Sequence, residues 1–245
     1  LFMRLSAVLV PITWLAQGRW SAFDVAAMPM TWLLGALFGT AWALLPLGIP
    51  VRWTGWCVML PALAWQPPRP DHGDWTLTAL DVGQGAAVLV RTSAHNLLFD
   101  TGPTMGQTNA GERVVIPVLR AFGIRALDAL VLSHADSDHI GGLRAVDSYF
   151  SVRQRYASFD LPARLHEGAR RCAAGDTWHW DGVIFTFLHP ELARPPMSST
   201  DSNAKRKFKT RKNAQSCVLK ISGRHHTVLL PGDLPAQQER TLVHQ

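Results

Sequence analysis

The sequence predicts an α/β domain that is preceded by apolar, membrane-crossing helices. Three observations support this prediction. Residues 25–51 contain no Asp, Glu, Lys or Arg. Residues 66–74 read QPPRPDHGD, a Pro-rich stretch that ends any regular structure. After this boundary, apolar strand patterns alternate with helical ones. We therefore divide the chain into a membrane region, residues 1–70, and a second domain, residues 71–245.

The membrane region contains one stretch that is long enough to cross a bilayer. The residues between Pro29 and Pro46 read MTWLLGALFGTAWALL. About 20 apolar residues, each rising about 1.5 Å, suffice to cross the hydrocarbon core. The pattern therefore predicts a transmembrane helix at about 29–46, with the shorter apolar segments 5–16 and 53–65 as further candidate spans or interfacial pieces. A buried core helix flanked by apolar loops is the alternative.

The glycines and charged residues of this region do not define how its helices pack or which way they cross the membrane. Gly35 and Gly39 have the G-x-x-x-G spacing that lets membrane helices approach closely, although glycine is common in such helices anyway. Every connection carries one positive charge, so the positive-inside rule gives no orientation. These four charges are Arg4, Arg19, Arg52 and Arg69.

Charge is concentrated in the second domain. Residues 1–70 contain only four of the 24 basic and one of the 18 acidic residues. This distribution excludes a disordered chain and a purely soluble protein. The chain carries a net charge of +6, and much of it comes from one cluster in residues 205–212. The cluster, a candidate nucleic-acid-binding segment or a solvated loop, consists of Lys205, Arg206, Lys207, Lys209, Arg211 and Lys212.

Cysteine usage predicts neither a disulfide framework nor a Cys-rich zinc site. The three cysteines, Cys57, Cys172 and Cys217, are widely spaced and form no C-x-x-C pair. The chain opens on Leu1 without a signal-peptide pattern, so we expect it to be a fragment of a longer protein.

The second domain begins as a β-meander and continues with alternating strands and helices. Alternating or continuous apolar runs predict the strands, and a helical apolar face followed by Gly123 predicts the first helix. The predicted strands are 75–82, 86–91, 96–100, 127–132, 183–188, 216–221 and 227–233, and the predicted helices are 112–122 and 143–150.

Four metal-capable side chains lie within six residues of one loop. The loop reads SHADSDHIGG at 133–142, directly after a buried strand. Imidazole and carboxylate ligands on a tight turn, with two glycines that keep the backbone close, are what a two-metal site requires. A polar, helix-capping loop would explain one of these residues but not the set. The four are His134, Asp136, Asp138 and His139.

The motifs together resemble a known family. DVGQG at 81–85, FDTG at 99–102, the loop at 133–142 and LLPGD at 229–233 follow in this order behind apolar helices. This arrangement resembles the metallo-β-lactamase-like domain of the ComEC family of DNA-uptake channel proteins of competent bacteria. The resemblance implies a metallo-β-lactamase-like αββα sandwich that is incomplete at its C-terminus and preceded by transmembrane helices.

The resemblance also implies ligand roles. His134 and Asp136 hold one metal ion, Asp138 and His139 hold the other, and Asp233 bridges both. Asp138, His139 and Asp233 are then the catalytic residues. A plain turn is the alternative reading of Asp233. Because Asp136 stands where most of the superfamily has an imidazole, we expect two divalent ions of the Mn²⁺ or Mg²⁺ kind, with Zn²⁺ as the other candidate.

The remaining assignments concern residues around the ligands. Asp81 and Asp100 are expected to organise the loops, and Asn213 with Ser216 matches an N-x-x-S segment of the family, with a turn role as the alternative. The next superfamily ligand is a histidine, but none of the candidates lies in a matching motif. They are His166, His179 and His189, while His225 and His226 are read as exposed strand-end residues. The family continues to a His-His-Gly segment, which His244 does not match, so this fragment is expected to lack a last ligand and activity on its own.

The implied function is metal-dependent cleavage of incoming DNA at an uptake channel. The resemblance places the parent protein in the bacterial inner membrane as a multi-pass channel, with the lactamase-like domain on the periplasmic face. Its expected partners are single- or double-stranded DNA and other DNA-uptake components, and the sequence does not define the oligomeric state. Two alternatives stay open: a non-catalytic DNA-binding domain of the channel, and a zinc hydrolase of lactams or thioesters.

Overall fold

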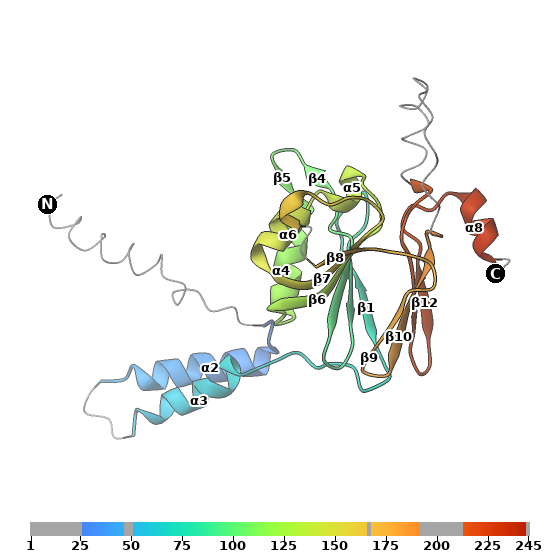
Figure 1. Cartoon of the computed structure of the whole chain (residues 1–245). Helices are drawn as coiled ribbons and strands as arrows, with labels where there is room; N and C mark the ends of the chain where they lie inside the picture. Colours follow the sequence, from blue (N-terminus) through green and yellow to red (C-terminus); the bar gives the residue numbers. More distant parts are fainter. Residues whose placement is uncertain (1–25, 47–50, 166–167, 192–212, 244–245) are drawn as a thin grey trace, which may run out of the picture. The chain divides into compact units, whose positions relative to one another are not determined.

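The computed structural model describes residues 26–46, 51–165, 168–191 and 213–243. The chain divides into two compact units (Figure 1). The first comprises 1–67 with 120–123, and the second comprises 68–119 with 124–245. In chain order the elements are α2 (Met30–Ala43), α3 (Thr54–Leu63), β1 (Thr76–Ala79), β2 (Val88–Arg91), β3 (Asn96–Phe99), β4 (Thr104–Met105), β5 (Thr108–Asn109), the π-helical turn Gly111–Val115, α4 (Ile116–Ala121), β6 (Ala126–Leu132), α5 (Ser137–Ile140), α6 (Leu143–Tyr149), β7 (Ser151–Ala157), the 3-10 turn Ala163–Leu165, β8 (Ala169–Arg171), β9 (Thr177–Trp180), β10 (Val183–His189), β11 (Val218–Ser222), β12 (Thr227–Leu230) and α8 (Ala236–Val243).

The first unit contains two short apolar helices that pack side by side. α2 and α3 meet where Gly39 faces Gly55, because a Cβ atom on either residue would collide with the backbone carbonyl of the other. Gly35 is the other half of the G-x-x-x-G pattern, and a Cβ atom added there would meet nothing within 4 Å. Within the described residues, no helix combines the length and the apolar character that a membrane span requires. The transmembrane helix expected at about 29–46 is therefore not confirmed, since α2 has 14 residues.

The first sheet of the second unit carries strands in the order β1-β2-β3-β6-β7-β8. β1, β2 and β3 form the expected antiparallel meander, and β6 then pairs in parallel with both β3 and β7. Buried on both faces, β6 exposes none of Ala129–Leu132. As in other sheets with parallel strands, the loop after such a central strand is a common position for functional side chains.

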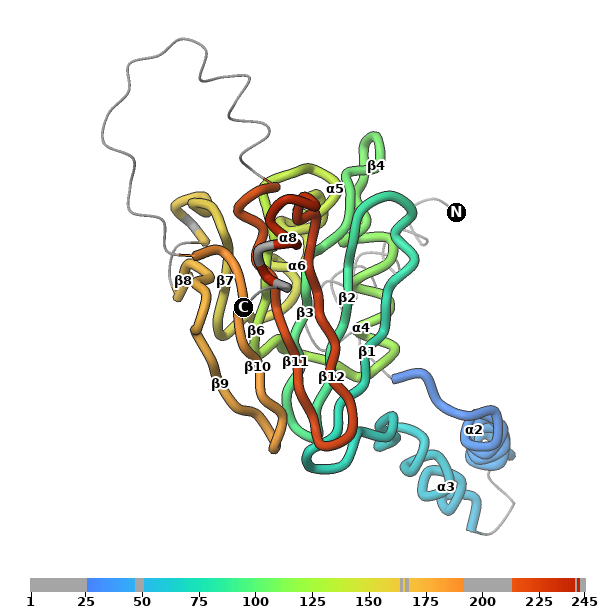
Figure 2. The backbone as a smooth tube through the Cα atoms, turned by 90° about the vertical axis from the view of Figure 1, so that its right-hand side faces the viewer, coloured from blue at the N-terminus to red at the C-terminus, as the bar shows by residue number. Residues whose placement is uncertain are grey.

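A second, antiparallel sheet packs against the first. Its order is β12-β11-β10-β9. Figures 1 and 2 show the two sheets face to face, with α4 and α6 on the outer side of the first sheet and α8 on the outer side of the second. The core between the sheets is made of fully buried apolar side chains from both, among them Leu97, Phe99, Val131, Phe185, Phe187, Leu219 and Ile221.

A disulfide crosses this core. It joins Cys172, which follows β8, to Cys217, which precedes β11, over a Cα–Cα distance of 5.9 Å that suits a native disulfide. Both residues are buried, whereas Cys57 is free and exposed. The sequence analysis did not anticipate this pair, because the two cysteines are 45 residues apart and meet only when the sheets pack.

We expect the disulfide to contribute measurably to stability. Cross-linking a loop of this length stabilises a folded domain by about 2–4 kcal/mol, so reduction should lower the melting temperature by about 5–15 °C. Calorimetry of the chain with and without reductant measures this shift. Cys57→Ser is the matched control and should leave the melting temperature unchanged. Equal melting temperatures for the oxidised and reduced chain would contradict the expectation.

Asp181, in the turn between β9 and β10, connects the second sheet to the first. Its Oδ2 accepts hydrogen bonds from Thr92 Oγ1 at 2.6 Å and from the backbone N–H of Ala94 at 2.7 Å, and it lies 3.0 Å from His95 Nδ1. Burial raises the pKa of Asp181, but these hydrogen bonds outweigh it and hold the pKa well below its ordinary value.

This depressed pKa predicts acid sensitivity with a defined sign. The stabilisation by Asp181 is complete above the ordinary pKa of 3.8 and is lost as the pH falls from there towards the lower folded pKa. Asp181→Asn should therefore be less stable than the unmodified chain at neutral pH, and the difference should shrink in acid. Urea titrations between pH 7 and pH 2.5 would measure it, and a difference that stays constant with pH would contradict the assignment.

Candidate metal centre

The candidate ligands lie at one end of the two sheets, where the buried strand β6 stops. The chain leaves β6 at Ser133, forms the short helix α5, and returns through Gly141 and Gly142. Asp136 precedes the first residue of α5 and accepts the backbone N–H of His139 through its carbonyl oxygen at 3.0 Å. The second sheet adds Asp233 from the turn after β12. Segments far apart in the sequence therefore supply one site.

Two buried imidazoles form the base of the site. The rings of His134 and His139 are 4.1 Å apart between centroids, and the residues are 0% and 2% exposed. The Nε2 atom of His134 is buried and has no hydrogen-bond partner among the described residues. A buried nitrogen without a partner is costly unless a ligand completes it, so this atom indicates an ion-binding position.

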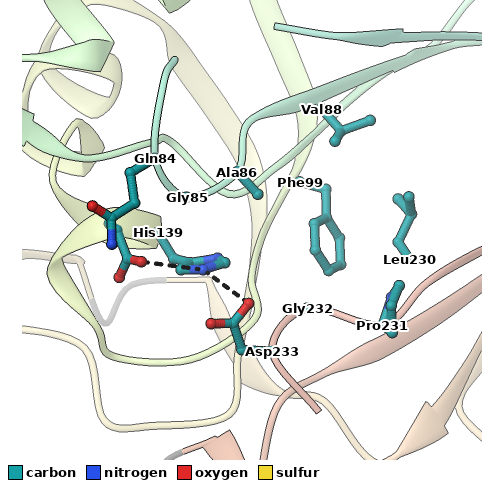
Figure 3. Close-up of a pocket in the computed structure, with 11 residues that line it drawn as sticks. Gln84, Gly85, Ala86, Val88, Phe99, His139, Leu230, Pro231, Gly232 and Asp233 are labelled. Atoms are coloured by element: carbon teal, nitrogen blue, oxygen red, sulfur yellow. Dashed lines mark ion pairs between the residues drawn. The ribbon is translucent and has the colours of Figure 1, made fainter. Parts of the chain in front are cut away.

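Three carboxylates surround the two imidazoles. Asp233 Oδ1 lies 3.3 Å from His139 Nε2 (Figure 3), and Asp233 Oδ2 lies 3.9 Å from His134 Nε2. Asp136 Oδ2 lies 3.7 Å from His134 Nε2, and Asp138 Oδ2 lies 4.0 Å from His139 Nε2. Each imidazole thus has its own carboxylate, and the two share a third.

The donor set fits divalent metal ions. Ligand atoms of His134, Asp138 and His139 all lie within 4.8 Å of one another, a spacing that a single ion can close. Two nitrogens and several carboxylate oxygens form a mixed set, and the oxygen share favours Mn²⁺ or Mg²⁺ more than the His-rich sites of zinc enzymes do. The assignment of His134 with Asp136 to one ion and of His139 with Asp138 to the other, which the family resemblance implies, stays a prediction.

Asp100 lies beneath the imidazoles and holds the loop. Its side chain is fully buried, and its backbone has the left-handed value φ = 58°. Oδ1 accepts the backbone N–H of Ser133 at 2.7 Å, and Oδ2 lies 2.7 Å from both Ser133 Oγ and His139 Nδ1. These contacts support the predicted role of Asp100 as a loop organiser.

The two imidazoles differ in proton affinity. Burial, together with the neighbouring His139, lowers the pKa of His134. Burial also lowers the pKa of His139, but the hydrogen bond and charge of Asp100 outweigh it, so this pKa is raised overall. A divalent ion must therefore displace a proton from His139 more often than from His134.

The DVGQG loop packs directly against the ligand loop at Gly85. A Cβ atom at Gly85 would overlap the backbone carbonyl of Asp138, and the residue has φ = 86°. Gly83 in the same loop also has a positive φ, 77°, but it has open space around it. Only Gly85 therefore combines the left-handed conformation with a close approach to a candidate ligand.

These two glycines provide a matched pair of variants. Gly83→Ala and Gly85→Ala both strain the backbone, at a cost of about 1–2 kcal/mol each. Gly85→Ala must in addition displace Asp138, so we expect it to lose metal affinity while Gly83→Ala keeps it. Metal titration followed by calorimetry would separate the two effects. Equal metal affinities in the two variants would show that the contact does not position Asp138.

An open pocket of about 440 Å³ adjoins the candidate ligands. His139 and Asp233 lie at one end, and apolar side chains line the other (Figure 3). Asp138 also lines the pocket. Gln84 from the DVGQG loop contributes an amide at the polar end. The apolar wall is formed by Ala86, Val88, Phe99, Leu230 and Pro231. A substrate bound here would place a polar group at the ligands and an apolar or aromatic group on this wall.

The other predicted residues are placed differently. Asp81 is exposed and makes no side-chain hydrogen bond within the described ranges. Asn213 and Ser216 form a turn in which the Ser216 N–H donates to the Asn213 carbonyl at 3.0 Å, and the Ser216 carbonyl accepts from His189 Nδ1 at 2.8 Å. The basic cluster of residues 205–212, and His166 and His244, lie outside the described residues.

Some residues of the site were not found from the sequence. Ser133 contacts Asp100 and both imidazoles, and Gly232 packs on its side chain. Ser133 was visible only as the residue before His134, and its position at the end of a buried strand was the available signal. Gln84 and Gly85 were seen as a turn, but their contact with the ligand loop depends on long-range packing.

The chain matches one family pattern and resembles several known proteins. The pattern of the metallo-beta-lactamase superfamily matches residues 80–243. Competence protein ComA of Neisseria gonorrhoeae is 37% identical over 95% of this chain and 30% of its own length. Recombination protein 2 of Haemophilus influenzae is 32% identical over 68% of this chain and 19% of its own length. A solved metallo-beta-lactamase from Cronobacter sakazakii is 15% identical with a TM-score of 0.43, covering 68% of this chain and 63% of that one.

These matches confirm the resemblance to the competence proteins, although the chain spans 30% or less of the length of the two relatives. The matched range begins one residue after β1 and ends with α8, so the segment from His134 to Asp233 lies within it. The chain therefore belongs to the metallo-beta-lactamase superfamily.

Proposed function

We propose that this chain carries a metal-dependent phosphodiesterase domain that cleaves DNA during DNA uptake. The observation that carries the proposal is the convergence of two imidazoles and three carboxylates beside an open pocket. No serine or cysteine nucleophile is required, because two divalent ions in such a site supply an activated water and stabilise charge on the phosphoryl oxygens.

Each residue has a defined task in this proposal. His134 and Asp136 would hold one ion, Asp138 and His139 would hold the other, and Asp233, whose two oxygens lie 3.3 Å from His139 Nε2 and 3.9 Å from His134 Nε2, would serve both. Asp100 keeps the proton of His139 on Nδ1, which leaves Nε2 free to bind. The apolar wall of the pocket faces a base or sugar while the ligands face the phosphate.

Three further observations support DNA as the substrate and a periplasmic location of the domain. The relatives are named for competence and recombination, processes in which a protein handles DNA. The basic cluster of residues 205–212 suits phosphates, which Lys and Arg neutralise without reading sequence. We further propose a bacterial inner-membrane protein whose domain faces the periplasm, where the Cys172–Cys217 disulfide is able to form and persist.

A side-by-side hydrolysis assay tests the proposal. The complete metallo-β-lactamase-like domain of the full-length parent protein is incubated with Mn²⁺, Mg²⁺ or Zn²⁺ and with labelled single- or double-stranded DNA, nitrocefin or lactoylglutathione. We expect cleavage of DNA with Mn²⁺ or Mg²⁺ and no turnover of the other substrates. Turnover of lactam or thioester with Zn²⁺, but not of DNA, would establish the alternative hydrolase. Bound metal without any turnover would instead favour a domain that only positions DNA.

A charge-reversal variant tests the basic cluster separately. Replacing its six Lys and Arg residues with Glu should weaken DNA binding and flatten the dependence of affinity on salt concentration. Unchanged binding would remove the cluster from the DNA interface without affecting the metal site.

A further inference from the structure

The buried hydroxyl of Ser133 has three polar neighbours but only one proton, so it donates one hydrogen bond and must accept the others. Its Oγ atom lies 2.7 Å from Asp100 Oδ2, 2.9 Å from His134 Nδ1 and 3.4 Å from His139 Nδ1. Ser133 is 0% exposed, so bulk water does not reach its hydroxyl. A serine hydroxyl has one proton to donate and two lone pairs with which to accept.

The charge of Asp100 determines which neighbour receives the hydroxyl proton of Ser133. An ionised carboxylate only accepts hydrogen bonds, so each close polar neighbour of Asp100 must donate to it. The neighbours are the Ser133 N–H, the Ser133 hydroxyl and His139 Nδ1. The hydroxyl proton of Ser133 is therefore used on Asp100, and Ser133 Oγ faces His134 Nδ1 as an acceptor.

This hydrogen-bond direction determines the protonation of His134 Nε2, the candidate ligand atom. A neutral imidazole carries its proton on one nitrogen only. If His134 donates from Nδ1 to Ser133, then its Nε2 carries a lone pair. That Nε2 is the buried atom without a hydrogen-bond partner, and it lies 3.7 Å from Asp136 and 3.9 Å from Asp233. These carboxylates mark the position that the sequence assigns to the first ion.

We propose that Ser133 is a positioning residue that relays the charge of Asp100 to His134 and fixes the imidazole tautomer whose Nε2 atom binds metal. Asp100 thus orients both imidazoles, His139 by direct contact and His134 through one hydroxyl. The inference rests on the proposed metal centre but not on the identity of the substrate.

The chain offers a matched control for this role. Ser158 is also buried, and its Oγ donates to the Ser133 carbonyl at 2.7 Å without contacting either imidazole. Ser158→Ala therefore removes a buried serine hydroxyl beside the same loop and leaves the relay intact. Ser133→Thr retains the hydroxyl, whereas Ser133→Ala removes it.

Two measurements on the metal-free chain test the proposal. Long-range ¹H–¹⁵N NMR of ¹⁵N-histidine-labelled protein, at a pH where both imidazoles are neutral and with His134→Gln as the assignment reference, reports which nitrogen of His134 is protonated. We expect a single tautomer protonated on Nδ1 in the unmodified chain, in Ser158→Ala and in Ser133→Thr. In Ser133→Ala we expect a mixture of tautomers.

Titration with Mn²⁺ alone supplies the second readout. Loss of a hydrogen bond that orients a metal-binding histidine typically lowers affinity about 10- to 100-fold, and we expect this loss in Ser133→Ala, rescue in Ser133→Thr and no loss in Ser158→Ala. A His134 protonated on Nε2 in the unmodified chain would overturn the proposal, even if Ser133→Ala fails to fold. An unchanged tautomer and unchanged Mn²⁺ affinity in folded Ser133→Ala would also overturn it. Neither readout uses DNA, so a failure of this proposal can be told apart from a failure of the nuclease assay.

Discussion

In the full-length parent protein, Asp138→Ala is expected to abolish DNA cleavage while leaving the fold intact. Asp138 lies 4.0 Å from His139 Nε2 and borders the open pocket, so its loss removes an oxygen donor of the second ion. Activity should fall by several orders of magnitude. The side chain is 28% exposed, and the turn is shaped by the close packing of Gly85 and Gly141. Stability without metal should therefore change by no more than about 1 kcal/mol.

Asp160→Ala is the matched control for the loss of a carboxylate. Asp160 is 79% exposed, and within the described part of the chain its ion pair is with Arg171, at 2.6 Å. This variant should keep both activity and metal content. Single-turnover cleavage rates, with metal content measured by elemental analysis, compare the two variants. A near-normal rate in Asp138→Ala would remove the two-ion assignment and with it the main support for an enzyme.

Asp100→Ala is expected to lower the free energy of unfolding more than Asp138→Ala does. The substitution leaves three buried donors without an acceptor: the Ser133 N–H, the Ser133 hydroxyl and His139 Nδ1. Each such donor costs about 1 kcal/mol or more, so the free energy of unfolding should fall by about 3 kcal/mol. Metal affinity should be lost as well, because both imidazoles lose their orientation.

Asp100→Asn separates the stability effect from the metal effect. Asparagine keeps the shape of the side chain and tolerates the left-handed backbone at this position, φ = 58°. It presents an NH₂ group where the carboxylate accepted, so metal affinity should fall although the stability loss is smaller than in Asp100→Ala. Urea denaturation and metal titration measure the two effects. Full metal affinity in Asp100→Asn would show that the charge of Asp100 does not orient the ligands.

Local patterns predicted most of the second unit. The meander, the buried strand and the loop at 133–142 are encoded by apolar periodicity and by the density of ligands within a few residues. The π-helical turn and α4 together cover the helix expected at 112–122. β7, β8 and β9 were not anticipated, because Ser151–Ala157 and the segments after it mix charged and aromatic residues without a clear alternation.

Contacts between distant segments could not be predicted in the same way. Cys172 and Cys217 join two sheets, and the proximity of Gly85 to Asp138 depends on how the first turn folds over the ligand loop. The role of Ser133 depends on the direction of three hydrogen bonds. The family resemblance supplied Asp233 as a shared ligand, since a Gly-Asp pair after a strand is otherwise an ordinary turn.

We propose that two divalent ions bind at one site, held by His134, Asp136, Asp138, His139 and Asp233. Anomalous diffraction from crystals soaked in Mn²⁺ locates and counts these ions. We predict two anomalous peaks, one beside His134 and Asp136 and the other beside Asp138 and His139, with Asp233 contacting both. No peak at these side chains under saturating Mn²⁺, or peaks only elsewhere on the chain, would rule out the two-ion site.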